Sequence, residues 1–67
     1  MDDWSEDVVE DYSTDELKQL LAAEQLQAES WASIARVATG RGKREAVASY
    51  QTAERHVAMI QIVLGRR

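Results

Sequence analysis

The chain has 67 residues, no cysteine, one histidine and a formal net charge of −4. A single domain of this size buries a smaller share of its surface than a larger one, and such domains usually depend on disulfides, a metal or association. The lack of cysteine excludes disulfides and thiolate metal sites, and a zinc site built mostly from carboxylates is uncommon. We therefore expect additional stability to come from association.

The composition predicts a soluble helical protein. No stretch approaches the roughly 20 apolar residues of a membrane span, and the acidic N-terminus does not resemble a signal peptide. Proline is absent, and the abundant residue types favour helix. We therefore predict an all-α, cytoplasmic protein. Because no catalytic or cofactor motif is present, we predict that it is not an enzyme and that it needs no cofactor.

Charge is distributed unevenly along the chain. Residues 1–29 contain ten acidic residues and one lysine, whereas residues 30–67 contain seven basic and two acidic residues. A chain of this kind can fold its acidic part onto its own basic end, or it can use the two ends for different partners.

Residues 1–12 form an acid-rich segment with a few apolar side chains. Such segments rarely fold alone, so we predict a flexible, solubilising arm or one that folds on contact. Trp4, Val8 and Tyr12 have the spacing of one helical face, which suits a short amphipathic helix on a partner or on the rest of the chain. These three residues are predicted to bind a partner.

A first long helix is predicted at about residues 14–38. Ser13 and Glu16 have the spacing of a capping box, in which each side chain binds a backbone N–H of the first turn. Apolar residues then alternate in steps of four and three, which is the pattern of a coiled-coil seam. The predicted core residues of this helix are Leu17, Leu20, Leu21, Trp31 and Ile34.

Residues 39–42 interrupt the helical pattern. Gly40 can adopt the left-handed conformation that ends a helix, and Gly42 adds a second flexible position. A short connection favours antiparallel neighbours, so we predict a second helix at about residues 43–64 that packs along the first. Its predicted core residues are Tyr50, Val57, Ile60 and Leu64.

The apolar surface is wider than two helices can cover. Two packed helices bury only the strips that face each other, and Ile62 lies opposite the second strip. We therefore predict a homodimer in which two antiparallel hairpins form a four-helix bundle. A complex with another protein is the alternative. Met59 and Ile62, on the apolar C-terminal turns, are predicted partner-binding residues.

Glu24 and His56 are polar residues within the predicted apolar faces. In an antiparallel hairpin, Glu24 is level with about residues 55–61, so His56 and Gln61 are candidate partners. A carboxylate in such a place is costly unless paired, and it can fix the register of helices. Glu24 and His56 are therefore predicted to set the register. The alternatives are a solvated Glu24 and a metal site between two hairpins that uses Glu24, His56 and Glu54.

The metal hypothesis has a geometric difficulty. Carboxylate-bridged sites in helical bundles use Glu and His three residues apart. Glu54 and His56 are two residues apart, so they point in different directions and cannot serve one site from one helix.

The basic turn gives a second hypothesis about function. Residues 30–36 and 43–50, separated by a glycine turn, resemble a helix-turn-helix with Arg41, Lys43 and Arg44 available to phosphates and base edges. The turn is about two residues longer than usual, and the second helix continues well past a recognition helix. The same turn lacks the spacing of a phosphate-binding Walker loop.

The sequence therefore favours a small non-enzymatic regulatory or adaptor protein. It would act through helix-mediated protein–protein interaction and homodimerisation, without a membrane. The alternative is a small DNA-binding transcriptional regulator that uses the basic turn.

Overall fold

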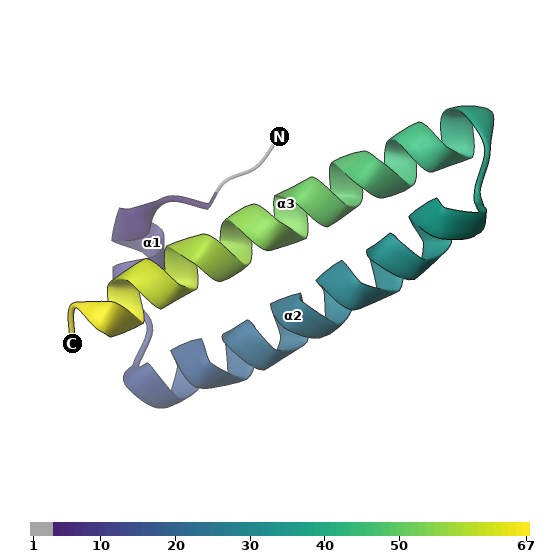
Figure 1. Cartoon of the computed structure of the whole chain (residues 1–67). Helices are drawn as coiled ribbons and strands as arrows, with labels where there is room; N and C mark the ends of the chain where they lie inside the picture. Colours follow the sequence, from purple (N-terminus) through teal and green to yellow (C-terminus); the bar gives the residue numbers. More distant parts are fainter. Residues whose placement is uncertain (1–3) are drawn as a thin grey trace.

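The computed structural model describes residues 4–67, a part of the chain that is all-helical and contains no strand. The helices are α1 (Glu6–Glu10), α2 (Thr14–Val37) and α3 (Gly40–Gly65). Helices α2 and α3 lie side by side and antiparallel, and α1 packs against α3 near the C-terminus (Figure 1). We call the end of the hairpin where α1 and the C-terminus lie the tail, and the end that holds the α2–α3 connection the tip. Residues 1–3 of the predicted arm lie outside the described residues.

Helix α2 begins with the predicted capping box. The Glu16 N–H donates to Ser13 Oγ at 3.1 Å, and the Ser13 N–H donates to Glu16 Oε1 at 2.9 Å. The backbone N–H of Ser13, followed by its hydroxyl, lowers the pKa of the Glu16 carboxyl because both favour the charged form. The helix runs to Val37, one residue short of the predicted end.

The α2–α3 connection is shorter than predicted. Ala38 and Thr39 are extended, Gly40 has a φ of 58°, and the second helix already begins at Gly40 rather than at residue 43. Glycine reaches a positive φ without steric cost. Gly40 therefore turns the chain from the two extended residues into α3, and Gly42 lies inside that helix. An ion pair between Arg41 and Glu45, one turn apart at 3.1 Å, spans this first turn.

The N-terminal segment packs on the hairpin. The sequence left open a flexible arm and a short helix that forms on a partner or on the rest of the chain, and residues 4–12 contain α1, which lies against the hairpin. The helical face of Trp4, Val8 and Tyr12 does not form, because α1 covers only Glu6–Glu10. Val9 faces the hairpin instead of Val8: the Val9 side chain is 1% exposed, whereas that of Val8 is 46% exposed.

The apolar core lies at the tail of the molecule. Val9 joins Leu17, Ile60 and Val63 in one buried cluster, with five half-buried apolar side chains around it: Trp4, Leu20, Leu21, Met59 and Leu64. Towards the tip, α2 and α3 meet through small residues. The buried side chains there are those of Ala28, Ala46 and Ala53.

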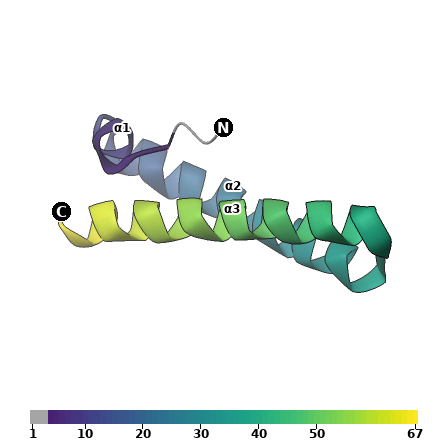
Figure 2. The same ribbon diagram turned by 90° about the horizontal axis from the view of Figure 1, so that it is seen from above.

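The predicted core residues are buried to different degrees along the hairpin. Leu17 and Ile60 are fully buried, whereas Ile34, near the tip, is 44% exposed. The remaining six are half-buried: Leu20, Leu21, Trp31, Tyr50, Val57 and Leu64. Figure 2 shows that α2 crosses α3 obliquely and that α1 lies only at the tail. Burial is therefore deepest where α1 supplies a third layer.

We predict a pH-dependent contribution from Glu16. Its folded pKa lies below the ordinary value of 4.5, so its stabilisation is present above that value and is lost as the pH falls through the folded pKa. Glu16→Gln retains a hydrogen-bond acceptor but does not titrate. Denaturant unfolding at a series of acidic pH values should show a flatter stability profile for this variant than for the wild type. Identical profiles would contradict the assignment.

Candidate functional site

The two C-terminal arginines hold the N-terminal segment in place. Arg66 forms ion pairs with Glu6 at 3.1 Å and with Glu10 at 3.3 Å. These pairs are half-exposed, and pairs of that kind contribute little individually. Arg67 donates to the carbonyl oxygens of Glu10 at 2.9 Å and Tyr12 at 2.8 Å, and to Thr14 Oγ1. The acidic segment is thus folded onto the chain's own basic end.

Trp4, His56 and Glu24 lie together although they come from three separate parts of the chain. The Trp4 indole stacks on the His56 imidazole with ring centroids 4.0 Å apart and an interplanar angle of 12°. His56 Nδ1 lies 3.4 Å from Glu24 Oε1, and both side chains are largely buried. The structure therefore brings together the two residues predicted to set the register, and it adds Trp4, which the sequence placed on a partner-binding face.

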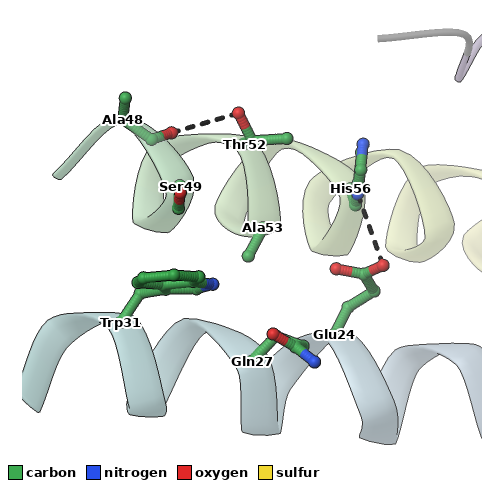
Figure 3. A pocket seen from close by; sticks show the side chains of 8 residues that line it. All are labelled: Glu24, Gln27, Trp31, Ala48, Ser49, Thr52, Ala53 and His56. Atoms are coloured by element: carbon green, nitrogen blue, oxygen red, sulfur yellow. Dashed lines mark hydrogen bonds and ion pairs between the residues drawn. The ribbon is translucent and has the colours of Figure 1, made fainter. Parts of the chain in front are cut away.

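A groove extends from His56 towards the tip on the same face of the hairpin (Figure 3). Its volume is about 320 Å³. Trp31 lies beneath Ala48 and Ser49 at the end nearer the tip, and the second carboxylate oxygen of Glu24 points into the groove. We call it the Trp31 groove. Its lining residues are Glu24, Gln27, Trp31, Ala48, Ser49, Thr52, Ala53 and His56.

A second groove lies between the other edges of α2 and α3. Its volume is about 610 Å³, and its wall combines half-buried apolar side chains with two carboxylates. We call it the Tyr50 groove. Its lining residues are Gln25, Ala28, Glu29, Ala32, Tyr50, Glu54, Val57 and Gln61.

The five predicted partner-binding residues are used in different ways. Trp4 and Met59 pack against the core cluster, so they act inside the chain. Val8, Tyr12 and Ile62 are 46%, 39% and 51% exposed. They remain on the surface near the tail, where another protein could reach them.

The three predicted nucleic-acid contacts lie on the first turn of α3 at the tip. Arg41, Lys43 and Arg44 are all exposed, and Arg41 pairs with Glu45. The helices of a helix-turn-helix meet at about 90–120°, whereas α2 and α3 lie alongside each other over their length (Figure 1). The resemblance in sequence is therefore not accompanied by that arrangement of helices.

Residues 4–67 contain no group of three His, Cys, Asp or Glu side chains that could hold a metal ion. No helix in the same range is long and apolar enough to cross a membrane. No family model, curated protein or solved structure matches the chain. The arrangement of its own side chains is therefore the basis for assigning a function.

We predict that Arg67→Ala loosens the N-terminal segment. The variant loses hydrogen bonds to two backbone carbonyls and to Thr14, so a glutamyl endopeptidase should cut after Glu6 and Glu10 faster than in the wild type. Arg44→Ala removes an exposed arginine at the tip and serves as the matched control. Equal cleavage rates in the two variants would show that Arg67 does not hold this segment.

Proposed function

We propose that the chain is a small non-enzymatic regulatory or adaptor protein that acts through helix-mediated protein–protein contacts and through homodimerisation. The observation that supports this most strongly is the incomplete cover of the hairpin. Trp31, Tyr50 and Val57 are half-buried in two grooves that α1 does not fill.

The hairpin is incompletely covered because the chain supplies one short helix to pack on two long ones. Helices bury their apolar stripe by packing against other elements, and a helix that is apolar over a wide arc needs cover on more than one side. Here the third layer is a helix of five residues, Glu6–Glu10, against two helices of 24 and 26 residues. Aromatic side chains in shallow, half-buried positions are typical of protein–protein interfaces. A second hairpin would complete a four-helix bundle.

The polar residues of the Trp31 groove favour binding over catalysis. A general base must lie within hydrogen-bonding reach of the hydroxyl that it activates. Ser49 is seven residues from His56 on the same helix, which is about 10 Å along the axis. Thr52 is closer, but its hydroxyl donates to the Ala48 carbonyl at 3.1 Å. These contacts support a role for the groove in recognition.

We expect the purified chain to be dimeric at micromolar concentrations. Sedimentation velocity should give a mass of about twice 7.6 kDa, and the melting temperature should rise with protein concentration because association stabilises the folded state. A monomer whose melting temperature does not depend on concentration would contradict homodimerisation.

A further inference from the structure

We propose that the Trp31 groove binds an arginine side chain of another protein, with the guanidinium at Glu24 and the aliphatic stem along Trp31. This inference rests on the proposed function and deepens it, because it names the chemistry by which an adaptor of this kind would recognise a partner. Three features of the groove support it: a carboxylate that is incompletely neutralised, a size that suits one side chain, and the polar groups beside that carboxylate.

The Glu24 carboxylate is largely buried without a lysine or arginine to balance its charge. Its side chain is 19% exposed, and its partner among the described residues is His56, whose Nδ1 lies 3.4 Å from Oε1. Charge-assisted hydrogen bonds are about 2.7–2.9 Å long, so this contact is weak. A buried carboxylate is costly unless it is well paired. Glu24 therefore gains more from an added cation than an exposed carboxylate does.

The second carboxylate oxygen of Glu24 can be reached from the groove. Figure 3 shows one oxygen directed towards His56 and the other directed along the groove towards the Trp31 end. No lysine or arginine lines the groove. The bases of the tip are remote, since Arg41 is 15 residues from His56 on α3, which is about 22 Å along the helix. A cation that enters the groove from outside therefore meets no competing base there.

The dimensions of the groove suit a single long side chain. Its volume of about 320 Å³ is at the lower end of the range for ligand pockets, about 300–1,000 Å³. Trp31 is seven residues from Glu24 on α2, which is about 10 Å along the axis, and Ala48 and Ala53 line the α3 wall. An aliphatic stem can lie along these apolar groups while its charged end reaches Glu24, as long basic side chains commonly do.

The polar groups beside Glu24 favour arginine over lysine. Gln27 is one turn from Glu24 on α2, and its amide also lines the groove (Figure 3). A guanidinium presents several N–H donors in a rigid plane and can bind both residues at once, whereas an ammonium is compact and more strongly hydrated. Arginine is also enriched at protein–protein interfaces, from which lysine is depleted.

The Tyr50 groove provides a comparison within the same chain. It contains two carboxylates, Glu29 and Glu54, but both residues are exposed. Water already solvates their charges, and ion pairs at exposed sites contribute little. An arginine side chain should therefore prefer the Trp31 groove, although the Tyr50 groove carries more negative charge.

A titration of the wild-type chain with N-acetyl-arginine amide, followed by two-dimensional NMR, tests the inference. The indole N–H resonance of Trp31 should shift in a saturable manner at millimolar concentrations. N-acetyl-citrulline amide has nearly the same shape with an uncharged urea in place of the guanidinium. It should bind about tenfold more weakly, because the charge-assisted contact with Glu24 is lost. N-acetyl-lysine amide should also bind more weakly than the arginine derivative.

Two variants of α2 locate the binding. Glu24→Gln keeps the shape of the side chain and removes its charge, so the affinity for the arginine derivative should fall about tenfold. Glu29→Gln removes an equal charge from the Tyr50 groove and should leave the affinity unchanged. A wild-type backbone spectrum away from each substitution shows that the fold is retained. If Glu24→Gln unfolds, the comparison of arginine with citrulline on the wild type decides.

Four results would overturn the inference. The first is equal affinity for the arginine and citrulline derivatives, and the second is an equal loss of affinity in both variants. The third is an equally tight lysine derivative, which would contradict the choice of arginine. The fourth is binding that appears only when dilution dissociates the chain into monomers, because a second copy would then be the occupant of the groove.

The outcomes also separate this inference from the proposed function. A monomeric chain that binds the arginine derivative through Glu24 would contradict homodimerisation and leave the arginine site standing. A dimer whose Trp31 resonance does not respond to the arginine derivative would overturn the arginine site and leave homodimerisation standing.

Discussion

The packing of Val9 into the tail of the hairpin is the contact on which the rest of the structure depends. Two helices side by side bury only the strips between them, so apolar surface outside those strips is buried only where a further element packs on it. Val9 packs in this way on Leu17, Ile60 and Val63, and these four are the largest fully buried side chains of the described residues. The contacts of Arg66 and Arg67 then fix the ends of the chain around this cluster.

The same constraint makes the molecule asymmetric along its length. At the tail, three elements close over apolar side chains. At the tip, α2 and α3 meet mainly through alanines, and larger side chains such as Trp31 and Ile34 stay partly exposed. The proposed interaction surface follows from this difference, because the part of the hairpin without a third layer is the part with apolar surface still to bury. Glu24 and His56 lie between the two regions.

Local signals in the sequence predicted the two long helices well. The Ser13–Glu16 capping box marked the start of α2, the glycine turn marked the reversal, and residue levels in an antiparallel hairpin placed Glu24 near His56. The start of α3 was missed because Gly42 has low helix propensity, a cost of about 1 kcal/mol relative to alanine. The Arg41–Glu45 pair and the continuing helix accommodate that cost.

The packing of the N-terminal segment could not be predicted from its local pattern. Trp4, Val8 and Tyr12 suggested one helical face, but a helix of five residues cannot present all three. Val9 is buried because of where the chain enters α2, and that path depends on contacts with residues more than 50 positions away. The uneven charge did indicate that the acidic segment could meet the basic C-terminus. It gave no means of choosing between Arg66 and Arg67 or of identifying their acceptors.

The most direct test of this account compares two neighbouring valines by denaturant unfolding. Val9 is buried in the core cluster and Val8 is 46% exposed, so the two substitutions remove the same atoms from different environments. Val9→Ala should lower the free energy of unfolding by about 2 kcal/mol, and Val8→Ala should change it by less than about 0.5 kcal/mol. Equal effects of the two substitutions would show that the N-terminal segment does not form the third layer of the core.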